Sequence, residues 1–285
     1  MDPEAALERL GGTARRADLL SLVSRRSLRR ALVERRVVRA GRDRYSLPAA
    51  DQARRAAVLL NGYLTHLSAA VHHGWEVRAV PERPHVAIPR GRAARPTQVA
   101  EVRQLDLQVE DVDGLATNPL QTVLWCARDL AFPDALAVAD SALRHGAIDR
   151  GELIRSAAGI AGRAGARARR VALYADGRAA NPFESTLRAI AIEEGIAVVP
   201  QFEVHARGLV LHPDLVDPMN GVVLEAESWE FHGKEKRAFE RDVERYTALV
   251  VSGWRVLRFT WAEVMLDPGH VRTCLRELYA ELAAA

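Results

Sequence analysis

Apolar and polar positions alternate in different ways along the chain and divide it into a helical start, a mixed middle and a strand-rich end. Near the start, apolar residues at helical spacing predict a helix over 3–10, a second helix that Thr13 caps and a third over 25–35. The next stretch, 37–47, has the strand and turn pattern of a hairpin. These elements predict a first domain over 1–50.

The middle of the chain mixes helical and strand periods, which predicts an α+β domain over 51–160. Glycine and arginine are then frequent, and this composition predicts a linker over 161–180 that carries one basic helix, 164–174. The predicted helices of the middle domain are 51–61, 67–75, 118–131, 134–145 and 149–157, and its predicted strands are 84–89 and 101–107.

The last region has several short apolar runs between two long amphipathic segments, so we expect a mixed β-sheet flanked by helices over 181–285. With the first two regions, this predicts a mixed α/β fold class. The predicted strands are 197–204, 209–215, 222–227 and 255–259, and the predicted helices are 182–194, 234–252 and a closing segment over 268–282.

Three acidic residues are the most informative chemical feature of the last region. A turn signal over 217–221 predicts a hairpin that brings Asp214 alongside the end of the strand 222–227. Glu225 and Glu227 lie two positions apart on that strand, so both side chains point to one face. Such carboxylates repel each other unless a cation lies between them, and Mg²⁺ or Mn²⁺ fits an oxygen-rich cluster. The alternative is an edge hairpin with solvated acids.

Arginine is concentrated in the first region. Between Arg15 and Arg44 there are 11 arginines against three acids, a net charge of +8 in 30 residues. This asymmetry indicates a polyanionic partner, although 38 of the 40 basic residues in the chain are arginine, which also indicates a compositional bias. Helices followed by a basic hairpin are typical of a winged helix-turn-helix domain, whose third helix enters the DNA major groove. The predicted DNA contacts are Arg25, Arg26, Arg29 and Arg30 on the helix, and Arg39, Arg42 and Arg44 on the wing. The alternative is a small helical domain that docks on protein.

Composition limits the class of protein. The chain of 285 residues is 48% hydrophobic and 27% charged, and no apolar run approaches the ~20 residues of a membrane span. The acidic N-terminus predicts no signal peptide. Cys126 and Cys274 are far apart and form no metal motif. We expect a cytoplasmic protein with no membrane partner.

Two motifs in the first region carry a resemblance. G-G-x-A-x-R-A-x-L spans Gly11–Leu19, and V-x-R-x-G-R-x-x-Y-x-L spans Val37–Leu47. Both resemble the N-terminal winged-helix domain of AbiEi-type antitoxins, and the resemblance implies DNA binding.

Six motifs in the last region carry a second resemblance. They are N-P-F-E-S (181–185), H-P-D-L (212–215), E-A-E (225–227), F-H-G (231–233), R-D-V-E-R (241–245) and G-W-R-V-L-R (253–258). Together they cover about 100 residues and resemble the restriction-endonuclease-like PD-(D/E)XK superfamily, in its branch related to very-short-patch-repair endonucleases. The branch has Asp where this chain has Glu227, and the superfamily's usual Lys is absent, although Lys234, Lys236 and Gln201 lie close by.

The second resemblance implies hydrolysis of a DNA phosphodiester bond with Mg²⁺ or Mn²⁺ as the cofactor. It implies that Asp214 and Glu225 bind the ion and that Glu184 and Glu227 complete the acidic shell. His232, five residues after Glu227, would act as a general base or steady the leaving oxygen. The alternative for His232 is a histidine packed in the core.

Two main functions follow from these patterns. The first is a metal-dependent endonuclease that its winged helix targets to DNA, in repair or defence. The second is an antitoxin-like transcriptional regulator whose nuclease-like domain is weak or inactive and serves for binding or dimerisation. A pure protein-interaction role is a third option. The sequence leaves open whether the protein forms a homodimer.

Overall fold

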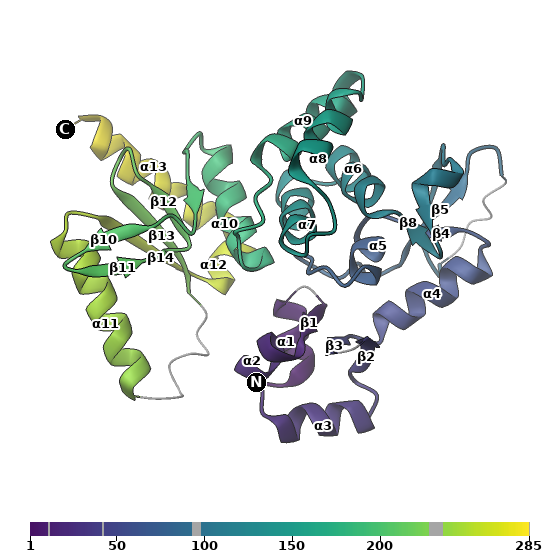
Figure 1. Cartoon of the computed structure of the whole chain (residues 1–285), viewed down its shortest axis with the longest axis horizontal. Helices are drawn as coiled ribbons and strands as arrows, with labels where there is room; N and C mark the ends of the chain where they lie inside the picture. The colour runs from purple at the N-terminus through teal and green to yellow at the C-terminus, as the bar shows by residue number, and fades with distance from the viewer. Residues whose placement is uncertain (11, 42, 93–97, 228–235, 285) are drawn as a thin grey trace. The chain divides into compact units, whose positions relative to one another are not determined.

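The computed structural model describes residues 1–10, 12–41, 43–92, 98–227 and 236–284, and it divides into two compact units, Met1–Gly177 and Arg178–Ala285 (Figure 1). Both units combine helices with β-sheet, which confirms the predicted mixed α/β fold class. Within these ranges, no helix has the length and apolar character needed to cross a membrane.

Unit 1 begins with three short helices and a three-stranded antiparallel sheet in the order β1-β3-β2. Ser24 caps α3, because its Oγ accepts a hydrogen bond from Ser27 N at 3.0 Å. The predicted hairpin is present as β2 and β3, but Thr13 lies in β1 instead of capping α2. Leu7, Leu19 and Leu28 are buried in the core of this part. The elements are α1 (Pro3–Arg9), β1 (Thr13–Arg15), α2 (Arg16–Leu22), α3 (Arg25–Val33), β2 (Val38–Gly41) and β3 (Arg44–Ser46).

The middle of unit 1 contains a five-stranded mixed sheet in the order β6-β5-β4-β8-β7. The sequence predicted β5 and β6, but β4, β7 and β8 have two residues each and are too short to show a period. Leu64, Val86 and Ala116 pack under α4. The elements are α4 (Ala49–Leu59), β4 (Tyr63–Leu64), α5 (His66–His72), β5 (His85–Pro89), β6 (Glu101–Leu105), a 3₁₀ turn (Val109–Asp111), β7 (Val112–Asp113) and β8 (Ala116–Thr117).

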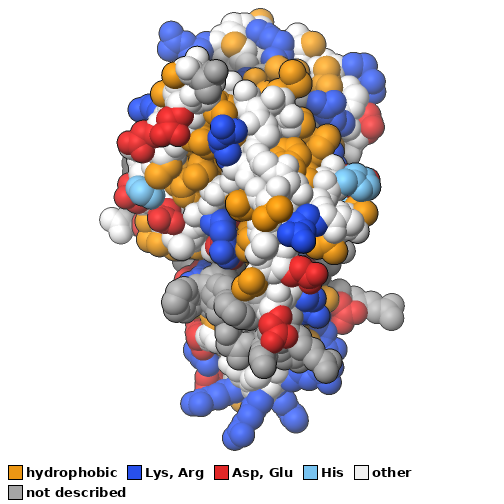
Figure 2. Space-filling model, turned by 90° about the vertical axis from the view of Figure 1, so that its left-hand side faces the viewer, with side chains coloured by type: hydrophobic (Ala, Val, Ile, Leu, Met, Phe, Trp, Pro, Cys, Tyr) orange, Lys and Arg blue, Asp and Glu red, His pale blue; other side chains and the backbone are white. Residues whose placement is uncertain are grey.

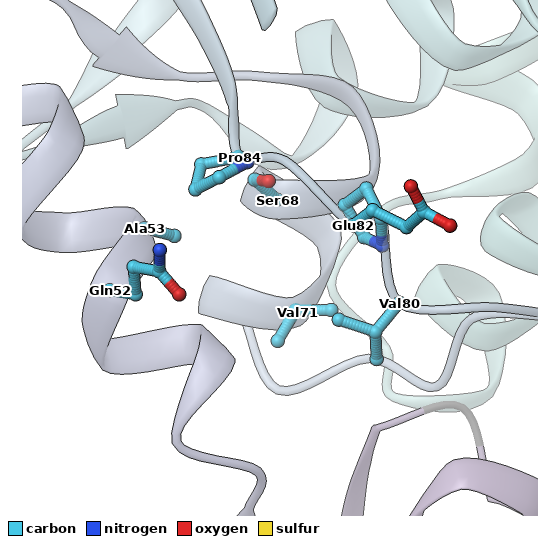
Figure 3. A pocket seen from close by; sticks show the side chains of 8 residues that line it. Gln52, Ala53, Ser68, Val71, Val80, Glu82 and Pro84 are labelled. Atoms are coloured by element: carbon cyan, nitrogen blue, oxygen red, sulfur yellow. The ribbon is translucent and has the colours of Figure 1, made fainter. Parts of the chain in front are cut away.

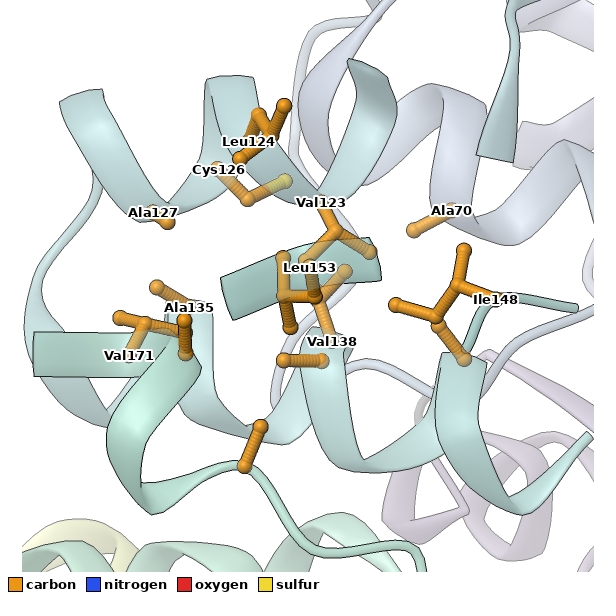
Figure 4. Packing of buried hydrophobic residues seen from close by; sticks show 14 of the residues in the cluster. Ala70, Val123, Leu124, Cys126, Ala127, Ala135, Val138, Ile148, Leu153 and Val171 are labelled. Atoms are coloured by element: carbon orange, nitrogen blue, oxygen red, sulfur yellow. The ribbon is translucent and has the colours of Figure 1, made fainter. Parts of the chain in front are cut away.

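Four helices complete unit 1 around a core in which Val123, Val138, Leu153 and Val171 meet (Figure 4). The predicted linker over 161–180 is wrong in one respect, because α9 buries Val171 in this core and is therefore part of the domain. Its arginines lie on the outer side, while small residues allow the inner side to pack closely. The elements are α6 (Pro119–Asp129), α7 (Phe132–Arg144), α8 (Arg150–Ala158) and α9 (Gly162–Tyr174).

Unit 2 is built on a four-stranded mixed sheet in the order β14-β13-β12-β9. The predicted hairpin over 217–221 is present, since β12 and β13 pair antiparallel with Leu215 opposite Leu224. The predicted single strand over 209–215 is wrong. It is divided at His212–Asp214, where Pro213 has no N–H to continue a ladder, and β11 pairs instead with β10. The strands are β9 (Val199–Pro200), β10 (Val204–Ala206), β11 (Leu209–Leu211), β12 (Leu215–Asp217), β13 (Val222–Glu227) and β14 (Arg255–Thr260).

Helices cover both faces of this sheet. Along β13, Val222 and Leu224 pack with α10 and α13, whereas Val223 packs with Leu249 of α11 on the opposite face. Because side chains alternate along a strand, Glu225 and Glu227 follow Val223 onto the α11 face. The helices are α10 (Pro182–Glu193), α11 (Lys236–Val251), α12 (Trp261–Leu266) and α13 (Pro268–Ala284).

Candidate functional site

Asp214 and Glu225 form a close pair at the end of the β12–β13 hairpin. Asp214 Oδ2 accepts a hydrogen bond from Ala226 N at 2.8 Å, which fixes its carboxylate beside β13. The Asp214 N–H is directed at Glu225 Oε2, 3.4 Å away. The structure therefore brings together the two acids that the sequence assigned to metal binding.

Burial gives this pair unusual electrostatics. Glu225 is only 2% exposed, and its Oε1 accepts a hydrogen bond from Arg245 Nη2 on α11 at 2.5 Å. Burial, followed by the charge of Asp214, raises the pKa of Glu225 to about 8, although Arg245 acts in the opposite direction. Burial also raises the pKa of Asp214. One guanidinium thus faces two desolvated carboxyl groups, an arrangement that favours either a proton or a further cation.

Glu227 has a different environment from Glu225, although both lie on the same face of β13. Its Oε1 accepts hydrogen bonds from Arg258 Nε of β14 at 2.9 Å and from the Tyr246 hydroxyl of α11. The Arg258 guanidinium also stacks on the Tyr246 ring, 3.9 Å from its centroid. Sequence reasoning missed this three-residue contact, and the signal for it was the R-F-T sequence (258–260) of β14, which runs parallel to E-A-E of β13.

Glu184 stands in the N-terminal cap of α10. Asn181 Oδ1 accepts hydrogen bonds from Phe183 N and Glu184 N, at 2.9 and 3.0 Å. In return, Glu184 accepts from Ala180 N at 2.8 Å and from Asn181 Nδ2 at 2.9 Å. This is a reciprocal cap of the kind that fixes a helix start. Glu184 therefore stabilises the start of α10, and both oxygens of its carboxylate accept hydrogen bonds within this cap.

The residues present fit a divalent cation only in part. Asp214 and Glu225 supply the close carboxylates that Mg²⁺ prefers, and their raised pKa values indicate unbalanced negative charge. Within the described residues, no group of three or more His, Cys, Asp or Glu side chains is arranged to hold a metal ion. His232 and Lys234, and the side chain of Lys236, lie outside the described part of the chain.

The predicted DNA contacts on α3 lie on its exposed face. Arg25, Arg26 and Arg29 are exposed, while Arg30 is also exposed but pairs with Glu34 at 2.8 Å. Figure 2 shows Lys and Arg side chains gathered at the lower end of the view, where Figure 1 has α3. Of the wing residues, Arg39 is exposed on β2; Arg42 and the side chain of Arg44 lie outside the described part of the chain.

A small pocket in unit 1 lies between α4, α5 and the loop before β5 (Figure 3). Its volume is about 20 Å³, which is room for roughly one water molecule. The Oγ of Ser68, in its wall, accepts a hydrogen bond from His85 N at 2.9 Å. The pocket is therefore too small for a substrate.

Comparisons with known proteins give relatives without a described activity. No family model matches the chain. The chain is 33% identical over 186 residues to "Uncharacterized protein Rv2248" of Mycobacterium tuberculosis strain H37Rv, an alignment that covers 64% of this chain and 68% of the relative. The chain belongs to the family of this mycobacterial protein. This chain is also 33% identical over 186 residues to "Uncharacterized protein MT2308" of Mycobacterium tuberculosis strain CDC 1551, with the same coverage of each chain.

The chain also has a weak similarity to a solved structure. The crystal structure of the RV2827C protein from Mycobacterium tuberculosis is 15% identical, with a TM-score of 0.32, over 73% of this chain and 88% of that chain. This similarity is too low to bear on fold or function.

Proposed function

We propose that this protein is a DNA-binding, divalent-metal-dependent endonuclease. The observation that carries the proposal is the buried Asp214–Glu225 pair, two carboxyl groups held together by the β12–β13 hairpin, with Arg245 hydrogen-bonded to Glu225. A carboxyl group whose pKa is raised to about 8 by burial and by a second acid is typical of a functional site. The mixed sheet with helices on both faces is the setting in which the PD-(D/E)XK resemblance expects such a pair.

In this proposal, Asp214 and Glu225 hold Mg²⁺ or Mn²⁺. Glu184 contributes by stabilising the start of α10 through its hydrogen bonds in the cap. The ion supplies charge neutralisation at the scissile phosphate and a more acidic water. Arg245 keeps Glu225 oriented through its hydrogen bond, and Ala226 N does the same for Asp214. Both carboxylates are therefore held in place by protein donors, which limits the reorganisation that binding the ion requires.

The first part of unit 1 supplies DNA affinity in this proposal. Its three helices and antiparallel hairpin follow the order of a winged helix-turn-helix domain, with α3 as the recognition helix. Arg25, Arg26 and Arg29 on the exposed face of α3 would contact phosphates or bases. Because these contacts release counterions, the affinity for DNA should fall steeply as salt rises.

The test is DNA cleavage by the purified full chain with Mg²⁺, with Mn²⁺ and with EDTA, on supercoiled, nicked and mismatched DNA. Asp214→Asn and Glu225→Gln keep the side-chain size but remove one charge each, and Glu203→Gln is the control at an exposed acid of the same unit. We expect metal-dependent cleavage that both site variants abolish and the control retains. Binding without cleavage on every substrate would refute the proposal.

A second function, an antitoxin-like transcriptional regulator, is favoured by a specific observation. Glu184 is engaged in a helix cap and Glu227 by Arg258, so two of the four expected acids already have protein partners. A domain with this geometry would serve for binding or dimerisation rather than catalysis. Sequence-specific binding to operator DNA, with unchanged affinity in Glu225→Gln and no cleavage, would support the regulator.

A further inference from the structure

Arg258 is held in one orientation by two kinds of contact. Its Nε and Nη2 lie 2.9 and 2.8 Å from Glu227 Oε1, so this edge of the guanidinium is fixed by a carboxylate. Its plane lies over the Tyr246 ring at 3.9 Å, and the Tyr246 hydroxyl donates to the same Glu227 oxygen. An arginine with both its edge and its plane fixed loses little conformational entropy when it binds a further group.

Part of the guanidinium remains available. An arginine has five N–H donors, and the contacts with Glu227 occupy Nε and one hydrogen of Nη2. The Arg258 side chain is 41% exposed, and Nη1 meets no acceptor within the part of the chain that the structure describes. The donors of Nη1 are therefore free for a ligand from solvent.

Arg258 also lies beside the carboxylate pair. It is the register partner of Glu225 on the neighbouring parallel strand, and strands in a sheet are about 4.8 Å apart. Its contacts with Glu227 and Tyr246 place its head on the α11 face, the face that carries Glu225. A phosphate that approaches Asp214 and Glu225 from this side would come within reach of Nη1.

We propose that Arg258 is the phosphate-binding residue of the unit 2 site, that it takes a phosphodiester oxygen of DNA through Nη1, and that Glu227 and Tyr246 are its positioning residues. The effect that we expect of Arg258 on cleavage rests on the proposed endonuclease function, whereas the effect that we expect on DNA binding does not. In this proposal Glu227 orients Arg258 instead of binding the metal ion. Arg258 then supplies a positive charge beside Asp214 and Glu225 in a chain that lacks the usual Lys of the superfamily. Guanidinium is well suited to phosphate because its donors match the spacing of two oxygens.

The first experiment measures how the Kd of the full chain for duplex DNA depends on salt, in EDTA so that no cleavage occurs. Arg258→Ala should reduce the slope of log Kd against log salt by about one, since one phosphate contact is lost. Arg255→Ala is the matched control, because Arg255 is an exposed arginine at the other end of β14. Arg258→Gln, which still donates to Glu227, should show the same loss as Arg258→Ala and guards against misfolding in the alanine variant.

The second experiment measures cleavage in Mg²⁺. Arg258→Ala and Arg258→Lys should both lower kcat by roughly 10- to 100-fold while KM changes less, because an ammonium keeps the charge but not the fixed planar geometry. Tyr246→Leu should resemble Arg258→Ala, and the double variant should be no worse than either single one, which a separate structural role would not produce.

The outcomes are distinguishable. A wild-type chain that cleaves no DNA would refute the endonuclease function, and the salt slope would still decide the role of Arg258. Arg258→Ala with a wild-type slope would overturn the inference, whatever the cleavage result.

Discussion

The raised pKa of Glu225 leads to a quantitative prediction about stability and pH. The ordinary value is 4.5 and the value in the folded protein is about 8, so the folded state binds this proton more tightly than the unfolded state does. Stability from this group is complete below pH 4.5 and is lost as pH rises through 8. Between pH 5.5 and pH 8, linkage gives a loss of about 3 kcal/mol, at up to ~1.4 kcal/mol per pH unit.

Glu225→Gln should remove this loss, because the amide is neutral at every pH and still accepts a hydrogen bond from Arg245. The variant should be more stable than the wild type by about 4 kcal/mol at pH 8 and by about 1 kcal/mol at pH 5.5, so the difference should grow by about 3 kcal/mol over this interval. Chemical denaturation followed by tryptophan fluorescence at several pH values measures the difference. Titrating groups away from this site contribute equally to both proteins, so the difference isolates the coupled Asp214–Glu225 pair. Glu203→Gln, at an exposed acid in the same unit, is the control.

Magnesium adds a second readout to the same comparison. If Asp214 and Glu225 hold the ion, then at pH 8 a concentration 100 times the Kd stabilises the wild type by about 2.7 kcal/mol. Glu225→Gln should show much less of this effect. A stability difference between wild type and variant that does not change with pH would refute the electrostatic reasoning, even if cleavage were observed.

Other predictions concern separate parts of the molecule. Asn181→Ala removes the cap of α10 and should lower the stability of unit 2 by about 1 kcal/mol in chemical denaturation, whereas Asn181→Ser, which keeps an acceptor oxygen without placing a second carboxylate beside Glu184, should retain part of it. Replacing Arg25, Arg26 and Arg29 with Ala should weaken DNA binding and reduce the salt slope by two to three, roughly one per lost phosphate contact, while leaving the melting temperature unchanged. Burial lowers the pKa of His85 to about 4, below its ordinary 6.5, so its contribution to stability is present above pH 6.5 and lost as pH falls toward 4; His85→Gln should make unit 1 less sensitive to acid over that interval.

Local signals in the sequence were sufficient for much of the fold. The amphipathic run over 25–35 placed α3, and the turn over 217–221 placed the β12–β13 hairpin with Asp214 beside Glu225. These features depend on caps, turns and alternation, which act over a few residues. The three-residue strand β1 was not predicted, because its pairing with β3 joins residues about 30 positions apart.

The candidate site was predicted less completely, for a related reason. The order of residues gave four acids, but it did not reveal that Glu184 is held by Asn181 or that Glu227 is held by Arg258. The contact between Glu227 and Arg258 depends on the register in which the parallel strands β13 and β14 pair. Register of this kind is set by tertiary packing and leaves no local trace.

The separation in sequence between the partners at this site also has a consequence for folding. Asp214 and Glu225 are 11 residues apart, Arg245 is 20 residues beyond Glu225, and Arg258 is 31 residues beyond Glu227. The hairpin alone would therefore bring two acids together before either arginine arrived, and their repulsion would oppose it. Only when α11 and β14 dock is the repulsion offset, so the hairpin gains stability from elements that are synthesised after it. Unit 2 should accordingly fold in one cooperative step, at a rate limited by these distant contacts.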